Sequence, residues 1–276
     1  MFADAEALSQ LVTLDEHVGW VPRLDTWKYD AYGVRPGEHA QEPRPGTVRV
    51  LVAGDSVAHR GRIQAALTPL WGDRVEWLNA GVEAFNTVQE AVWYERHNRF
   101  LSPDRVLLLF HPNDYEPTPI PAFGPEGRLQ LLTPGAEALT PQPWLFRHSW
   151  LYRWSLMVRI QGGFAPRMDI QGVHSALRRW VEVAEEDGAE LLVAVLPMIL
   201  PEERWAPVRH DARQDVMALL ESMGVPAVDL APVLKSALEQ GVALEELQET
   251  PRDSLHPSDV LAALFAACLD EAWGDG

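Results

Sequence analysis

Short runs of branched apolar residues alternate with longer segments of helical periodicity, and this alternation restricts the fold more than any other feature of the sequence. The apolar runs lie at residues 48–54, 75–78, 106–110, 191–196 and 227–230. The segments with helical periodicity lie at 62–70, 87–98, 173–187 and 208–223. Short apolar strands joined by helices predict an α/β fold in which a mostly parallel five-stranded sheet is covered on both faces, a three-layer α/β/α sandwich.

Two parts of the chain do not follow this alternation. Residues 1–47 begin with a short helical pattern at 4–12 and continue with many proline and glycine residues, which predicts an N-terminal arm packed on the domain. The domain itself is expected to span 48–276, with a proline- and tryptophan-rich insertion at about 114–166 lying over the site. The aromatic group at 144–154 is either a lid or stacking platform for substrate, or the set of residues that packs the insertion on the domain.

The composition excludes several kinds of partner and site. The 276 residues carry a formal net charge of -17, which disfavours nucleic acids and anionic membrane surfaces as partners. The single cysteine, Cys268, allows no internal disulfide and no site of several thiolate ligands, and we expect it in the core. The longest apolar stretch, 191–200, is shorter than the roughly 20 residues that a membrane span requires. Because we see no secretion-signal pattern after Met1, we expect a cytoplasmic protein from this sequence, or an extracytoplasmic one if a leader was removed.

The first candidate for chemistry is Gly54-Asp55-Ser56, where the first predicted strand turns into a helix. A serine at this turn exposes its hydroxyl at the carboxyl end of the strand, where backbone N–H groups can meet an oxyanion. The alternative is that Asp55 or Ser56 only caps the helix.

A second candidate, Asp253-Ser254-Leu255-His256-Pro257, directly precedes a final segment of helical periodicity at 260–269. Serine is a weak nucleophile at neutral pH, and a histidine held by a carboxylate is the kind of base that activates it. Two residues three positions apart can both come from one turn. The alternative is a structural Asp and His with no part in chemistry.

Two more predicted strands end in Asn79-Ala80-Gly81 and Pro112-Asn113-Asp114. A glycine lets its N–H approach an oxyanion without an obstructing Cβ, and an asparagine amide is a neutral donor. Each residue by itself is equally well explained as a turn residue. Because the fold brings the carboxyl ends of its strands to one edge, the four blocks together favour a joint site.

These blocks resemble the motifs of the SGNH, or GDSL, hydrolases. The likeness rests on Gly54-Asp55-Ser56, Gly81, Asn113-Asp114 and the Asp253 to Pro257 block, and it covers roughly 48–273. A less specific likeness to the segment that precedes the catalytic block in some bacterial members covers 17–36. The resemblance implies a flavodoxin-like α/β/α fold and acyl-ester chemistry that needs neither a cofactor nor a metal.

The resemblance also implies a role for each matching residue. Ser56 is the nucleophile, His256 the base and Asp253 the acid that orients the base. The N–H groups of Ser56 and Gly81 and the amide of Asn113 form the oxyanion hole.

Four residues next to these are candidates for lining the substrate: Asp55, Val57, His111 and Asp114. The sequence departs from the family pattern at Val57, where leucine is usual, at His111, where glycine is usual, and around Leu264, where glycine is frequent. None of these departures removes a reacting atom. An imidazole at His111 either narrows the pocket or adds a donor, and both roles stay open.

The function that follows is a serine esterase for short-chain or acetyl esters, with a small-molecule or carbohydrate ester as the expected partner. An acyltransferase would use the same serine chemistry, and a non-catalytic carbohydrate-binding module could share the fold. The intact Ser56, Asp253 and His256 disfavour the non-catalytic alternative. A nucleotide-binding domain is disfavoured because no glycine-rich phosphate motif follows the first predicted strand. The sequence does not predict the oligomeric state.

Overall fold

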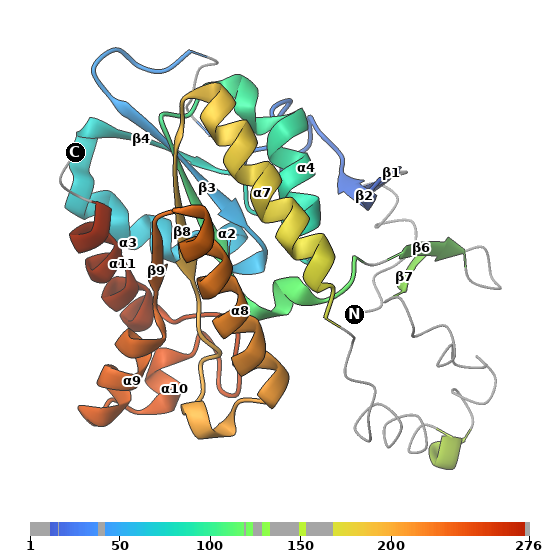
Figure 1. Ribbon diagram of the computed structural model, residues 1–276, viewed down its shortest axis with the longest axis vertical. Helices are drawn as coiled ribbons and strands as arrows, with labels where there is room; N and C mark the ends of the chain where they lie inside the picture. Colours follow the sequence, from blue (N-terminus) through green and yellow to red (C-terminus); the bar gives the residue numbers. More distant parts are fainter. Residues whose placement is uncertain are drawn as a thin grey trace.

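A central five-stranded sheet organises the molecule (Figure 1). The computed structural model describes residues 12–15, 17–37, 42–118, 120–123, 129–132, 149–152 and 168–273. The strands of the sheet are β3 (Val48–Gly54), β4 (Val75–Asn79), β5 (Arg105–Phe110), β8 (Glu190–Val195) and β9 (Ala227–Asp229). They lie in the order β4-β3-β5-β8-β9, and every neighbouring pair is parallel. The five predicted strands and their parallel arrangement are therefore confirmed.

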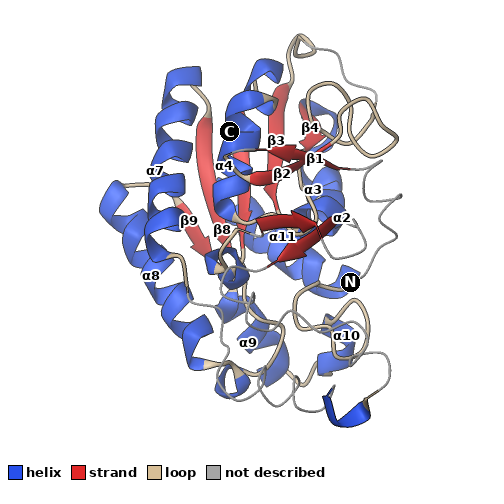
Figure 2. Cartoon of the chain, turned by 90° about the vertical axis from the view of Figure 1, so that its right-hand side faces the viewer, coloured by secondary structure: helices blue, strands red, loops and turns tan. Residues whose placement is uncertain are grey.

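Helices cover both faces of this sheet (Figures 1 and 2). One face carries α4 (Thr87–Arg96), α7 (Ile170–Asp187) and α8 (Pro207–Met223). The other face carries α3 (Arg62–Trp71), α9 (Ala231–Glu239) and α11 (Asp259–Trp273). Shorter helical segments are α2 (Ser56–Arg60), α10 (Leu244–Leu247), η1 (Gly72–Arg74), η2 (Asn98–Leu101), η3 (Pro112–Tyr115) and η5 (Glu202–Arg204). The three predicted layers are thus present.

The alternation of side chains along β3 explains why its sequence is apolar throughout. Leu51 and Ala53 pack into the cluster beneath α4, α7 and α8, whereas Val50 and Val52 pack into the cluster on the opposite face. A strand covered on both faces has no polar side, so its sequence lacks the alternating pattern of a half-exposed strand. The same argument applies to β5, whose residues from Val106 onward are buried.

The longest helix, α7, shows how capping and packing select a segment of this chain. Asp169 Oδ1 accepts the Gly172 N–H at 3.0 Å and begins the helix three residues before the predicted start. Its buried face includes Trp180, whose ring stacks on Tyr94 of α4 with ring centroids 4.6 Å apart. The contact joins the two helices that cover the centre of this face.

The segment before β3 contains a strand pair that the sequence patterns did not predict. The strands β1 (Val12–Asp15) and β2 (Gly19–Pro22) form an antiparallel pair, and Trp20 of β2 packs edge to face on Phe85. The Tyr29 hydroxyl donates to Gly81 O at 3.1 Å, so the segment also contacts the loop after β4. The helix predicted at 4–12 lies outside the described residues except for Val12, which begins β1.

The predicted insertion at 114–166 is described only in part. Its strands β6 (Ile120–Phe123) and β7 (Leu129–Leu132) form a second antiparallel pair, and β6 lies beside β2 (Figure 2). Trp150 is described and exposed, whereas most of the aromatic group at 144–154 lies outside the described residues, so the predicted lid or platform stays a prediction. Cys268 is half-buried against the core beneath α11. Within the described ranges, we find no helix whose length and apolar character would suffice to cross a bilayer.

Candidate active site

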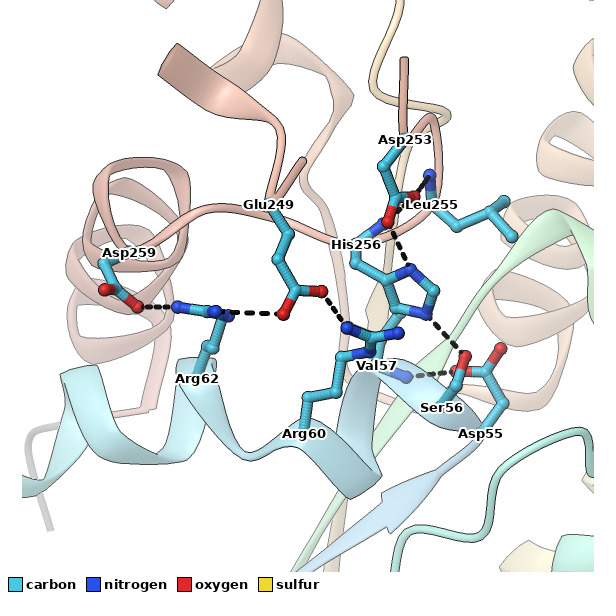
Figure 3. A network of polar contacts seen from close by, with 10 residues as sticks. All are labelled: Asp55, Ser56, Val57, Arg60, Arg62, Glu249, Asp253, Leu255, His256 and Asp259. Carbon is cyan, nitrogen blue, oxygen red and sulfur yellow. Dashed lines mark hydrogen bonds and ion pairs between the residues drawn. The ribbon is translucent and has the colours of Figure 1, made fainter. Parts of the chain in front are cut away.

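The loop between β3 and α2 presents Ser56 at the carboxyl end of a central strand. Gly54 ends β3 with φ +142°, and a Cβ built at this position would lie 2.8 Å from Leu109 O. Asp55 then caps α2, because its Oδ1 accepts the Val57 N–H at 2.8 Å. The capping alternative is therefore right for Asp55, and Ser56 begins the helix with its hydroxyl turned toward the C-terminal part of the chain (Figure 3).

The hydroxyl of Ser56 meets the imidazole of His256, which is 200 positions later in the chain (Figure 3). Ser56 Oγ and His256 Nε2 are 2.8 Å apart, and His256 Nδ1 is 2.8 Å from Asp253 Oδ2. A carboxylate only accepts hydrogen bonds, so the proton of the neutral ring lies on Nδ1. Nε2 is then unprotonated and able to accept the serine proton. The three residues thus form a continuous chain of hydrogen bonds that can activate a nucleophile.

Asp253 is held as a carboxylate at the start of this chain. Its Oδ1 accepts the backbone N–H groups of Leu255 at 3.0 Å and His256 at 3.1 Å. Burial would raise the pKa of Asp253, but these bonds and the one from the imidazole outweigh burial and hold the pKa below its ordinary value. The turn that places Asp253 beside His256 therefore also keeps it charged.

Gly81 lies directly against the backbone of α2. A Cβ at this position would be 2.1 Å from His59 N and 2.5 Å from the Ala58 carbonyl carbon, so only glycine fits. The Gly81 N–H donates to Asn79 Oδ1 at 3.1 Å. Its implied role as an oxyanion donor therefore requires that this hydrogen bond be exchanged.

Asn113 reaches the site from η3, directly after β5. Its Nδ2 donates to Asp55 Oδ2 at 3.3 Å, which places the amide beside the residue that precedes the nucleophile. An amide nitrogen carries two hydrogens, so one remains for a developing oxyanion. The sequence prediction that Asn113 and Ser56 share one site agrees with this arrangement.

The four candidate substrate-lining residues expose almost no surface. Asp55, Val57, His111 and Asp114 are between 0% and 3% exposed. Asp114 Oδ2 accepts the His111 N–H at 2.8 Å at the start of η3. These side chains support the loops of the site from behind and leave little area for a substrate to touch.

A buried carboxyl on α4 was missed at the sequence level. Glu90 is 3% exposed, and neither of its carboxylate oxygens has a hydrogen-bond partner among the described residues. Burial raises the pKa of Glu90 well above its ordinary range, and the charges of Asp114 and Asp55 raise it further. The sequence could have indicated Glu90, because it lies on the apolar face of the helical segment at 87–98.

An ionic network links α2, which begins with Ser56, to the loop that carries His256 (Figure 3). Glu249 accepts hydrogen bonds from Arg60 of α2 and from Arg62 of α3, the second at 2.9 Å between Nη2 and Oε1. Arg62 also donates to Asp259 at the start of α11. The Glu249 N–H donates to His256 O at 3.0 Å. No spacing in the sequence indicated this network, because its members are almost 190 positions apart.

The same loop contains the one group of possible metal ligands found among the described residues: Glu249, Asp253 and His256. Asp253 and His256 are hydrogen-bonded to each other, and Glu249 is neutralised by two arginines. Each of these three side chains therefore already has a hydrogen-bond or ion-pair partner within the protein.

Comparisons with known proteins define the class of this fold. No family model matches the sequence, and no curated protein sequence matches it. Solved structures do match. The acetylxylan esterase Axe2 of Geobacillus stearothermophilus is 15% identical with a TM-score of 0.54, over 84% of this chain and 96% of its own. LAE5, an α/β hydrolase enzyme from the metagenome of Lake Arreo, is 16% identical with a TM-score of 0.56, over 82% and 95%.

A protein of Parabacteroides merdae described as a GDSL-like lipase gives a similar match, 14% identical with a TM-score of 0.53, over 82% of this chain and 95% of its own. The chain therefore has the α/β fold of SGNH hydrolase structures, and the resemblance seen in the sequence is confirmed at the level of the fold. The structural neighbours are esterases and lipases.

Proposed function

We propose that this chain is a serine esterase that hydrolyses short acyl esters, above all acetyl esters of carbohydrates. The observation that carries the proposal is the Ser56–His256–Asp253 chain, with 2.8 Å at each of its two links. A helix cap and a structural histidine would not need to meet with this geometry. A carboxylate, an imidazole and a hydroxyl in this order are the groups that acyl transfer to serine requires.

The reaction proceeds in two halves. His256 Nε2 takes the hydroxyl proton as Ser56 Oγ attacks the ester carbonyl, and the oxyanion forms beside the Asn113 amide. The imidazolium, stabilised by the Asp253 carboxylate, then gives its proton to the departing alcohol, and an acyl-serine remains. In the second half, His256 takes a proton from water, the hydroxide attacks the acyl carbonyl, and Ser56 leaves with that proton as the acid is released.

Two observations support an acetylated carbohydrate as the substrate. The neighbour Axe2 is named as an acetyl-xylooligosaccharide esterase. The formal net charge of -17 on this chain disfavours strongly anionic substrates and is compatible with neutral acetylated sugars.

The test is intact-mass analysis after incubation with a fluorophosphonate, which labels an activated serine. We expect one adduct on the wild type and on Ser236→Ala, a matched serine substitution on α9, and none on Ser56→Ala. Release of p-nitrophenol from the acetate ester should exceed release from the octanoate ester. An unlabelled wild type with a native circular dichroism spectrum would overturn the esterase and favour a non-catalytic binding module.

A second measurement separates hydrolysis from transfer. The wild type is incubated with p-nitrophenyl acetate and an excess of xylooligosaccharide, and free acetate and acetylated sugar are quantified by mass spectrometry. We expect free acetate to dominate. Acetylated sugar as the main product would replace the hydrolase by an acyltransferase while leaving the role of Ser56 unchanged.

A further inference from the structure

The imidazole of His111 contacts the side chain of Asn113 at the back of the candidate site. His111 follows β5 directly and is 0% exposed. Its backbone N–H is held by Asp114 Oδ2 at 2.8 Å, and Arg209 Nη1 of α8 donates to Pro112 O at 2.8 Å. The ring therefore has a fixed place, and its Nδ1 lies within hydrogen-bond reach of Asn113 Oδ1.

The surroundings of the Asn113 amide decide which way it faces. An amide can turn by 180° and exchange its oxygen and nitrogen, and the hydrogen-bond partners select the orientation. Asp55 Oδ2 lies 3.3 Å from Asn113 Nδ2, and a carboxylate only accepts, so the NH₂ group must face Asp55. The oxygen then faces His111, which has to supply a proton.

The proton on His111 belongs on Nδ1. With the amide oxygen facing the ring, an unprotonated Nδ1 would place two lone pairs in contact. The backbone N–H of Asn113, whose nitrogen lies 3.3 Å from Nδ1, is therefore the weaker contact. Burial lowers the pKa of His111, although the Asp55 charge opposes the shift, and the ring therefore carries a single proton at neutral pH. Nε2 is buried without a partner among the described residues, as suits an unprotonated nitrogen better than an N–H group.

We propose that His111 is a positioning residue, whose Nδ1–H donates to Asn113 Oδ1 and keeps the Asn113 NH₂ group aimed at the oxyanion of the Ser56 reaction. This inference rests on the proposed esterase function for its kinetic consequences. The sequence left two roles open for His111, narrowing the pocket or adding a hydrogen-bond donor. The proposal selects the second role, with the Asn113 amide and not the substrate as the group that accepts the hydrogen bond. Without that donor only the 3.3 Å contact with Asp55 holds the amide, and its oxygen, left without a partner, can turn toward the oxyanion, where it would repel negative charge.

The kinetic test is a double-mutant cycle between His111 and Asn113 with p-nitrophenyl acetate. Removing one oxyanion donor costs about 10² to 10³ in kcat, so an amide that is turned away about 90–99% of the time should cost between about 10-fold and 100-fold. We expect His111→Phe to lower kcat by that factor with KM unchanged within about twofold. In the Asn113→Ala background, the same substitution should cost less than about twofold, and His210→Phe should cost nothing in either background.

An equal loss from His111→Phe in both backgrounds, a loss in KM alone, or full activity would each overturn the proposal. A second experiment on the wild type needs no activity. Long-range ¹H–¹⁵N NMR of the imidazoles shows which nitrogen of His111 carries the proton, assigned by the signal that is missing in His111→Phe or, if this variant does not fold, in His111→Gln. We expect Nδ1–H at pH 7, and a proton on Nε2 alone would overturn the proposal. A wild type that fluorophosphonate does not label would instead refute the esterase, and the NMR result would still decide the hydrogen bond.

Discussion

Replacing Gly81 with alanine should displace the helix that carries the nucleophile. A Cβ at this position would lie 2.1 Å from His59 N, and an ordinary van der Waals contact begins at 3.4 Å, so the backbone of α2 has to move by about 1.3 Å. Ser56 is the first residue of α2, and its Oγ lies 2.8 Å from His256 Nε2. A shift of about 1 Å breaks this hydrogen bond, and misplacement on that scale costs roughly 100-fold in rate. Overpacking should also lower the free energy of unfolding by about 1–3 kcal/mol.

The assay compares kcat/KM for p-nitrophenyl acetate, the rate of fluorophosphonate labelling and the urea midpoint. The matched control is Gly172→Ala, whose Cβ would lie 2.2 Å from Asp169 Oδ2. That neighbour is the end of a rotatable side chain, so the control should lose one helix cap, about 1 kcal/mol, and no activity. A Gly81→Ala variant that folds and keeps the wild-type labelling rate would refute the argument that contact with Gly81 sets the position of Ser56.

The remaining predictions concern Asp253, the loop residue Ala84 and the ion pairs of Glu249. Asp253→Asn should lower kcat by about 10³ to 10⁴, measured with p-nitrophenyl acetate, because an amide cannot hold the imidazole proton as a carboxylate does. Because the folded-state pKa of Asp253 is depressed, the carboxylate stabilises the fold above pH ~4 and this contribution is lost as pH falls through the folded pKa. The wild type should therefore melt above Asp253→Asn at pH 7, and equal differences at pH 7 and pH 2.5 would contradict this. Ala84 has φ +64°, a conformation that glycine adopts more readily than alanine. Ala84→Gly should therefore raise the free energy of unfolding, measured with urea, by about 0.4–1 kcal/mol. Ala218→Gly, on the exposed face of α8, should lower it by about 1 kcal/mol. Glu249→Gln should lower the free energy of unfolding by about 0.5–1 kcal/mol at low salt. The loss should shrink in 1 M NaCl, because salt screens the ion pairs with Arg60 and Arg62. An unchanged loss would show that charge is not the cause.

The central fold was predictable because burial on both faces leaves a continuous apolar signal in each strand. The runs at 48–54, 75–78, 106–110, 191–196 and 227–230 differ from the observed strands by at most one residue at either end. The pair β1–β2 was not predictable, because each strand has only four residues, too few to show a hydrophobic periodicity. Likewise, α10 has only four residues, too few for periodicity to stand out.

The candidate site divides in the same way. Ser56 was predictable from the local block at the end of β3, and Asp253 and His256 from the block before α11. The structure brings these side chains together. What local blocks could not show is where the backbone N–H of Gly81 points, since this depends on the side chain of Asn79. The sequence also could not show that the four candidate substrate-lining residues are buried, because their exposure depends on packing by distant segments.

The separation of 200 positions between Ser56 and His256 has a consequence for biosynthesis. At about 5–20 residues per second, the ribosome makes the serine roughly 10–40 s before the histidine. During that interval the nascent chain holds a serine with no base beside it, so it cannot attack an ester. On the proposed mechanism, activity begins only after the loop of His256 and α11 have docked, so the order of translation itself delays activity.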